Sequence, residues 1–273
     1  MSKRTNKQIF IALIFLLILI GIGFLIYSSW IKPKPSCFDG IQNQEEEKID
    51  CGGSCQPCEL VNIKNIEVIS VKVVSSQNNF YDLAAKIKNP NQNYGSGKVP
   101  YQFELYDSQD NLIVQYSGLT YILPNQTKYL LKIKTESNKP VKQVKISFNK
   151  IDWEKLETYQ PPQLGVQEKE YRLLSDQESG FAQVKAMLIN KTNFDFDKID
   201  IDILLFDSYN RLLAINTNEL RTFLAGQERD FLSTWFNQIS GQVNLIEIEA
   251  ETNIFDSDNY LSGTREKERF QEY

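Results

Sequence analysis

Histidine is absent from the 273 residues of this chain. That absence removes the commonest general base, the commonest transition-metal ligand and the usual sensor of pH between about 5 and 8. The sequence also lacks the G-x-S-x-G, H-E-x-x-H, P-loop and dinucleotide-binding motifs. We therefore expect a protein that is not an enzyme and that has no small-molecule substrate. An active site built from carboxylates, or from lysine and serine, is the remaining catalytic alternative.

Long hydrophobic runs are absent except for one, from Ile9 to Ile31, which contains no charged residue. As an α-helix with a rise of ~1.5 Å per residue, it can span a hydrocarbon core of ~30 Å. Lys3, Arg4 and Lys7 precede it, so the positive-inside rule places the stub of residues 1–8 in the cytoplasm. A cleaved signal peptide is the alternative, but its apolar core would have only ~7–15 residues, and YSSWIKPKP offers no small-residue cleavage site. The run is predicted to be a signal anchor, a single transmembrane helix of the cell membrane with all later residues extracytoplasmic.

An excess of basic residues is also absent. The formal net charge is −5, and because three basic residues precede the apolar run, the remainder of the chain is more acidic still. Binding to a nucleic-acid backbone depends on clustered lysine and arginine. We therefore expect no nucleic-acid partner, and we interpret the acidity as a contribution to solubility.

Cysteine is confined to one short stretch, at Cys37, Cys51, Cys55 and Cys58. This stretch has few apolar side chains, so its order must come from covalent or metal cross-links. An extracytoplasmic location favours two disulfides, and four cysteines allow three pairings that the sequence leaves open. A four-cysteine zinc site and a redox-active Cys55-Gln-Pro-Cys58 pair are the alternatives.

The same stretch carries oxygen ligands at spacings of four, three and four residues: Asp39, Asn43, Glu46 and Asp50. Short turns could bring such side chains to one calcium ion, although the spacing is not that of an EF-hand; a solvated charged face is the alternative. The pattern C-x-DGIQNQ-x-E-x-x-x-DCGGSC-x-PC resembles a short D-G-x-x-N…D-C-G-G-x-C module that is repeated in bacterial secreted and surface proteins. The resemblance implies an extracellular, disulfide-bonded module in which calcium is a plausible ligand.

From Val61 onward, short alternating apolar runs separated by Asn, Gly, Pro and Ser are typical of half-buried antiparallel strands. A shift of about a hundred residues places NFYDLAAKIKNPNQN on GFAQVKAMLINKTNF, and YQFELYDSQDNLI on IDILLFDSYNRLL. The chain therefore contains two copies of one domain. Corresponding residues are Phe80 and Phe181, Asn89 and Asn190, Asp107 and Asp207, Leu112 and Leu212, and Leu123 and Leu224.

Each copy holds about seven candidate strands in ~90 residues without a helical period, which is typical of a Greek-key β-sandwich. The predicted fold is all-β, with two tandem immunoglobulin-like antiparallel β-sandwiches after the transmembrane helix and the disulfide-rich module. The predicted parts are the stub 1–8, the helix 9–31, the cysteine-rich module 32–60, the first sandwich 61–158, the linker 159–165, the second sandwich 166–260 and the charged tail 261–273.

Asp107 and Asp207 occupy equivalent hairpin turns after apolar strands, and we expect them to cap those turns rather than to bind a metal or to catalyse. The passage FELYDSQDNLI resembles the FxLYD family of bacterial envelope β-sandwich domains. It is also similar to the water-stress and late-embryogenesis-abundant-like (WHy-like) sandwiches, whose Asn-Pro-Asn segment matches residues 89–91, whereas Asn190-Lys-Thr departs from it. These resemblances imply immunoglobulin-like domains at a membrane or cell surface, without known catalysis.

The expected function is that of a non-enzymatic, membrane-anchored module of the cell envelope with a structural or protein-interaction role. Its expected partners are the membrane and other envelope proteins or cell-wall polymer. The alternative is an accessory subunit of an envelope machine, such as a secretion, pilus or cell-division complex.

Overall fold

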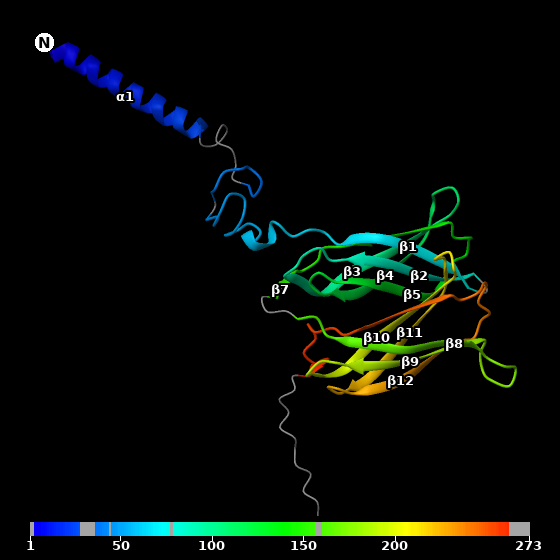
Figure 1. The fold of residues 1–273 in the computed structure, drawn as a ribbon. Coiled ribbons are helices and arrows are strands. Elements are labelled where there is room, and N and C mark those ends of the chain that lie inside the picture. The colour runs from blue at the N-terminus through cyan, green and yellow to red at the C-terminus, as the bar shows by residue number, and fades with distance from the viewer. Residues whose placement is uncertain (1–2, 28–35, 44, 77–78, 157–159, 262–273) are drawn as a thin grey trace, which may run out of the picture. The chain divides into compact units, whose positions relative to one another are not determined.

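The computed structural model describes residues 3–27, 36–43, 45–76, 79–156 and 160–261 (Figure 1). The chain divides into two compact units, Met1–Asn62 and Ile63–Tyr273. The first unit contains one α-helix and the cysteine-rich loops. The second contains all the β-strands and is the larger part of the molecule.

The helix α1 runs from Lys3 to Ile26. It therefore begins inside the predicted stub 1–8, because no proline or glycine interrupts the helix-compatible residues before the apolar run. Its described apolar side chains lie exposed, Phe10 and Leu17 by 66% and 67%. In the described part of the chain, no helix combines the length and hydropathy required to cross a membrane. Residues 28–31 of the predicted span lie outside the described residues, so the membrane crossing stays a prediction.

The second unit is all-β, as predicted, and repeats one pattern of seven strands. The first copy consists of β1 (Glu67–Ser75), β2 (Phe80–Lys88), β3 (Tyr94–Tyr106), β4 (Leu112–Ile122), β5 (Thr127–Glu136), β6 (Gln143–Phe148) and β7 (Glu154–Lys155). The second consists of β8 (Leu164–Leu173), β9 (Ala182–Asn190), β10 (Asp195–Phe206), β11 (Leu212–Phe223), β12 (Glu228–Trp235), β13 (Leu245–Glu251) and β14 (Tyr260–Leu261).

Strand order confirms the duplication. In the first copy the sheets are β1-β2-β5 and β4-β3-β6, with β7 also paired to β3. In the second copy they are β8-β9-β12 and β11-β10-β13, with β14 also paired to β10. All the pairs are antiparallel. Each strand of one copy thus has a counterpart seven strands later with the same neighbours.

The alternation in the sequence explains the layers. In β3, Phe103 and Leu105 are fully buried, and they pack with Leu83 and Ile87 of β2 in the core of the first copy. The counterparts on β10 and β9 form the core of the second copy. Because strand side chains alternate between faces, the residues between these core positions point away from the core of their own sandwich.

The last two residues of the predicted linker 159–165 belong to a strand. β8 begins at Leu164, which pairs with Asn190, and Gly165 pairs with Ile189. These two residues are therefore part of the second sandwich. The remainder of the predicted tail, residues 262–273, lies outside the described residues.

Candidate functional site

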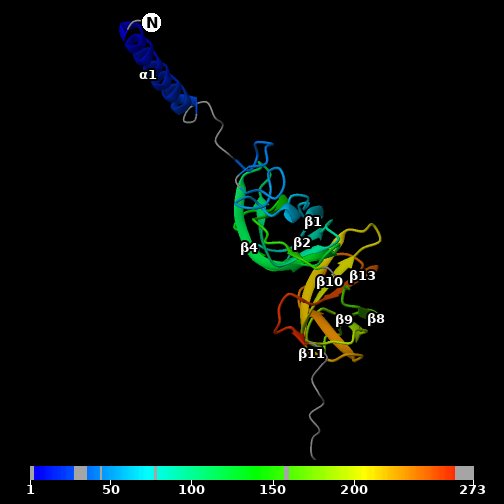
Figure 2. The ribbon, with the colours of Figure 1, turned by 90° about the vertical axis from the view of Figure 1, so that its left-hand side faces the viewer.

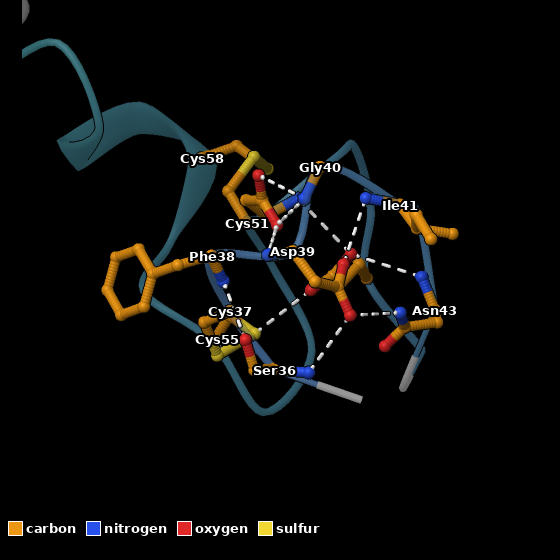
Figure 3. The surroundings of a disulfide bond; sticks show 12 residues. Ser36, Cys37, Phe38, Asp39, Gly40, Ile41, Asn43, Cys51, Cys55 and Cys58 are labelled. Atoms are coloured by element: carbon orange, nitrogen blue, oxygen red, sulfur yellow. Dashed lines mark hydrogen bonds between the residues drawn. A yellow bond between two sulfur atoms is a disulfide. The ribbon is translucent and has the colours of Figure 1, made fainter. Parts of the chain in front are cut away.

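The cysteine-rich module contains two disulfides, Cys37–Cys55 and Cys51–Cys58, which close loops with sequence separations of 18 and 7 residues (Figure 3). This confirms the predicted use of the cysteines and selects one of the three possible pairings. The structure contains no free cysteine, so the four-cysteine zinc site is not formed. Cys55 and Cys58 belong to different disulfides, so they do not form a redox pair with each other.

The acidic side chains of the module organise its backbone (Figure 3). Asp50 Oδ1 accepts hydrogen bonds from the amides of Asp39 and Gly40, both at 3.0 Å. Asp39 in turn accepts from the amide of Ile41 and from Asn43 Nδ2, at 2.9 and 3.0 Å. The Asn43 side-chain bond, followed by backbone bonds, lowers the pKa of Asp39. These contacts hold the first turn of the module against its far end.

Glu46 is the most buried acidic residue of the module, 6% exposed. Its Oε2 accepts from the amides of Asn43 and Asp50, at 3.1 and 3.2 Å. The backbone of Gly52 lies close to that of Glu47, the residue after Glu46. Gly52 has a φ of +83°, and a Cβ at this position would lie 2.7 Å from the Glu47 amide nitrogen. The glycine of the Asp-Cys-Gly-Gly segment is therefore required by backbone geometry.

The predicted calcium ligands are linked to one another by hydrogen bonds: Asp39 to Asp50 and Asn43, and Glu46 to Asn43 and Asp50. In the described residues, the single group of three possible ligands is Cys37, Glu46 and Cys55, whose sulfurs are joined in a disulfide and carry no thiolate for a metal. Asp39 and Asp50 do not join Glu46 in such a group. Their oxygens accept backbone amides, and Asn43 Oδ1 is a buried oxygen without a hydrogen-bond partner in the described residues. Calcium binding by Asp39, Asn43, Glu46 and Asp50 therefore stays a prediction.

Replacing Asp50 by alanine should accelerate reduction of the module. The change removes the acceptor for two backbone amides, and one net hydrogen bond of ~1 kcal/mol corresponds to a roughly fivefold effect. Timed reduction by dithiothreitol, followed by maleimide tagging and electrophoresis, measures the rate. The exposed neighbour Glu47→Ala is the matched control and should reduce at the wild-type rate. Equal rates for both variants would show that Asp50 does not organise the module.

Buried asparagines form equivalent hubs in the two sandwiches. Asn89 and Asn190 are both fully buried. Asn89 Nδ2 donates to the carbonyls of Tyr94 and Leu123, at 2.6 and 2.9 Å, and its Oδ1 accepts from the amide of Asn91. Asn190 Nδ2 donates to three carbonyls in the corresponding loops of its copy. The first asparagine of the Asn-Pro-Asn segment therefore joins neighbouring loops by hydrogen bonds. Asn190 does the same in the second copy, where no proline follows it.

The turn aspartates are caps, as predicted. Asp107 Oδ1 accepts from the amides of Gln109 and Asn111, both at 2.9 Å. Asp207 Oδ1 accepts from the corresponding amides of Tyr209 and Arg211, at 2.9 and 2.8 Å. The backbone bond from Asn111 lowers the pKa of Asp107. Neither carboxylate is available as a catalytic base, because each is an acceptor for its own turn.

A third apolar cluster joins the two copies. It contains Ala84 and Tyr129 from the first sandwich, and Leu204, Phe206 and Ile215 from the second, all buried. The outer face of the β1-β2-β5 sheet thus packs against the outer face of the β11-β10-β13 sheet, as the neighbouring positions of β5 and β10 show in Figure 1. We call this contact the junction. It makes the two sandwiches one packed body.

Charged and aromatic groups from both copies extend the junction. Lys128 forms an ion pair with Glu251, with only 6% and 13% of the two side chains exposed, and its Nζ lies 4.0 Å from the Tyr121 ring centroid. The amide of Tyr129 donates to Glu249 at 2.7 Å, and its hydroxyl donates to Glu247 at 2.9 Å. Removing one partner of an ion pair buried this deeply would leave the other charge buried and unpaired, which is strongly destabilising. The pair therefore favours one register of the two sheets.

Beside the ion pair lies a cavity of ≈ 400 Å³, lined among others by Tyr101, Lys128, Asp202 and Glu251. Burial, reinforced by Glu247, raises the pKa of Tyr129, so its phenol is harder to ionise than usual. Lys128 is engaged by Glu251. The cavity therefore brings polar groups of both copies together without giving either of these two groups the properties of an activated nucleophile.

Comparison with known proteins adds no family. No family model matches the sequence, and no curated protein matches it. Among solved structures, a mutant of Bacillus subtilis oxalate decarboxylase is similar at 6% identity with a TM-score of 0.10, over 69% of this chain and 77% of that one. A TM-score this low carries no argument about fold or function.

Two carboxyl groups of the junction are held partly protonated near neutral pH. Burial raises the pKa of Asp202 to about 8, even though Lys128 opposes the shift; Glu251, Glu249 and Asp200 reinforce it. Burial also raises the pKa of Glu249 to about 7, against the lowering effect of the Tyr129 amide. Both groups bind protons more tightly in the folded protein than in an unfolded chain, where carboxyl pKa values are about 4.

The free energy of unfolding should therefore fall as pH rises from about 5 to 8, because ionising these two groups opposes the folded state. Asp202→Asn removes one of the two groups and should flatten this dependence, leaving the variant more stable than the wild type at pH 8. Denaturant titrations at several pH values measure the slope. Asp230→Asn, on the exposed face of β12, is the control and should keep the wild-type slope. An unchanged slope in Asp202→Asn would contradict the assignment.

The junction was missed by the sequence analysis, although the two copies contain a signal for it. At matching positions, the buried Ala84 and Tyr129 of the first copy correspond to Lys185 and Asp230 of the second, which form an exposed ion pair at 3.0 Å. Equally, the fully buried Leu204 corresponds to Glu104, which lies on the free face of the other sheet. A residue that is apolar in one copy and charged in the other indicates which face is covered.

Proposed function

We propose that this chain is a non-enzymatic, membrane-anchored extracytoplasmic protein of the cell envelope that holds two joined immunoglobulin-like sandwiches outside the membrane. The observation that carries the proposal is the order of parts along the chain. An uncharged apolar run is followed by a module with two disulfides and then by two sandwiches. Disulfides persist in oxidising compartments and are rare in the cytosol, which supports an extracytoplasmic location for the module.

The sandwiches support a structural or binding role. Their turn aspartates and buried asparagines are occupied by backbone groups, and the junction polar groups bind one another. The resemblance of FELYDSQDNLI to the FxLYD family points in the same direction, to envelope domains without catalysis. In this proposal the sandwiches bind other envelope proteins or cell-wall polymer, and calcium is not required for their order.

Accessibility labelling in intact cells tests the location. Tyr209→Cys places a thiol at a position that is 80% exposed, and Ser2→Cys places one before the apolar run. A membrane-impermeant maleimide should label the first variant in intact cells and the second only after lysis. Removal of residues 1–31 should move the protein out of the membrane fraction. Full-length protein in the soluble fraction, or the opposite labelling pattern, would refute the proposal.

An accessory subunit of a secretion, pilus or cell-division complex is the second candidate. The exposed apolar side chains of α1, with Gly21 and Gly23 among them and open space beside both glycines, suit packing against a partner helix. Purification in a mild detergent should then recover a second protein in fixed proportion, and Gly21→Leu should release it. Recovery of this chain alone would count against this candidate and leave the first.

A further inference from the structure

The strand β4 is an edge of the first sandwich. Its last residues, from Leu119 to Tyr121, line two cavities together with residues of β10 and β11, whereas residues 112–118 line neither cavity. β4 lies at the end of the β4-β3-β6 sheet, and in the described residues it pairs only with β3 (Figure 2). Its eleven residues, LIVQYSGLTYI, include neither a charged residue nor a proline. We propose that β4 pairs antiparallel with β4 of a second copy of this chain, joining two β4-β3-β6 sheets into one continuous sheet. This inference rests on the sandwich fold and is independent of the proposed cellular role.

The other edges carry the features that natural sheets use to prevent such pairing. Charged side chains, bulges and irregular backbone all discourage a new strand from adding to an edge. β8 has Glu168, Lys169 and Glu170 together with a register shift, and Glu168 has a φ of +53°. β5 contains several lysines, and β13 alternates glutamate with apolar residues. Of the described edge strands longer than two residues, β4 is the one without a charge.

The duplication supplies an internal comparison. β11 is the counterpart of β4 and occupies the same place in its sheet. It carries Glu219 and Arg221, which bond to each other and to neighbouring charges, and Thr222 has a φ of +52°. The same edge is therefore charged and irregular in one copy, and uncharged in the other. Between Val114 and Thr120, β4 also pairs with β3 without a register shift, so its outer side is regular.

The sequence of β4 is complementary to itself about a two-fold axis. If two strands pair antiparallel around Tyr116, Gln115 lies opposite Ser117 of the second copy, and Ile113 lies opposite Leu119. These positions alternate, so they share the outer face of the sheet, where Gln115 and Ser117 are exposed and Leu119 is 62% exposed. The pairing thus brings one polar and one apolar pair together on each side of the axis. No like charges meet, which is the usual obstacle to a symmetric strand pair.

A charge placed on this edge tests the inference. The double substitution Gln115→Lys with Ser117→Lys sets lysines opposite lysines across the two-fold axis, at exposed positions that the monomer tolerates. The control adds the same residues to the other edge of the same sheet, Gln143→Lys with Ser147→Lys, also at exposed positions. Sedimentation and native mass spectrometry of the full chain in detergent measure the monomer–dimer equilibrium.

We expect the wild type and the β6 control to dimerise and the β4 variant to show at least a tenfold higher dissociation constant. A second variant, Gln115→Cys with Ser117→Cys, should form a covalent dimer on mild oxidation, because paired strands place opposing Cβ atoms within ~4.5–5.5 Å. A monomeric wild type would overturn the proposal. A dimer that survives in the β4 lysine variant, or that does not cross-link, would overturn it as well.

Discussion

Leu204→Glu is expected to open the junction and to lower the free energy of unfolding by about 3–5 kcal/mol. Leu204 is fully buried in the cluster that joins the sandwiches. A carboxylate there is desolvated among apolar side chains, and the nearby Lys72 and Lys86 already lie over the rings of Phe206 and Tyr129. An uncompensated buried charge costs roughly this amount. Glu247 and Glu249 of β13, which accept hydrogen bonds from Tyr129 in the same cluster, add to the cost by repelling a further carboxylate.

The matched control for this substitution is Leu232→Glu. Leu232 lies on the free outer face of β12 and is 53% exposed, so the same chemical change should alter stability by less than about 0.5 kcal/mol. Urea titrations of both variants give the comparison. We expect Leu204→Glu to unfold at lower urea, with the two sandwiches no longer melting in one transition. If the two variants lose the same stability, the junction does not hold the sandwiches together.

Asn89→Leu is expected to cost about 2–4 kcal/mol, although leucine is apolar and close in size. The substitution leaves the Tyr94 carbonyl without its Asn89 donor and the Asn91 amide without its Asn89 acceptor, whereas the Leu123 carbonyl keeps the Gln126 amide at 3.3 Å. Each buried unsatisfied group costs ~1–3 kcal/mol. Asn190→Leu should have an effect of similar size, since Asn190 donates to three carbonyls in the second copy. Thermal and denaturant unfolding measure both losses.

The control is Asn149→Leu, which changes an exposed asparagine outside the strands and should leave the free energy of unfolding within about 0.5 kcal/mol of the wild type. A loss below 1 kcal/mol in Asn89→Leu would mean that the Tyr94 carbonyl and the Asn91 amide find other partners. It would also remove the structural explanation for the Asn-Pro-Asn segment.

The strands and the duplication could be predicted because alternation and turn residues are local signals. The segments around Phe103 and Ile203 alternate with period two, and Asp107 and Asp207 end their strands in both copies. Local signals also sufficed for the two disulfides, given the compartment. They did not suffice for the pairing of Cys37 with Cys55, because three pairings share one spacing and depend on how the loop closes.

The features that the sequence did not reveal depend on which side chains meet across the fold. The spacing proposed Asp39 and Asp50 as calcium ligands, but it did not show that both carboxylates organise the loop by accepting its backbone amides. The junction was not predicted because Leu204 and Tyr129 are residue types common in strands, and nothing in their own segments indicates a second packing face. Their role is visible only when the two copies are compared position by position, where Glu104 and Asp230 replace them on the uncovered faces.

Disulfide mapping of the chain isolated from its native membrane fraction tests the central claim most directly. Free thiols are first blocked, and the protein is then digested without reduction and analysed by mass spectrometry. The account predicts that no cysteine is blocked and that the cross-linked peptides join Cys37 to Cys55 and Cys51 to Cys58. Four blocked cysteines, or cross-linked peptides with another pairing, would contradict it.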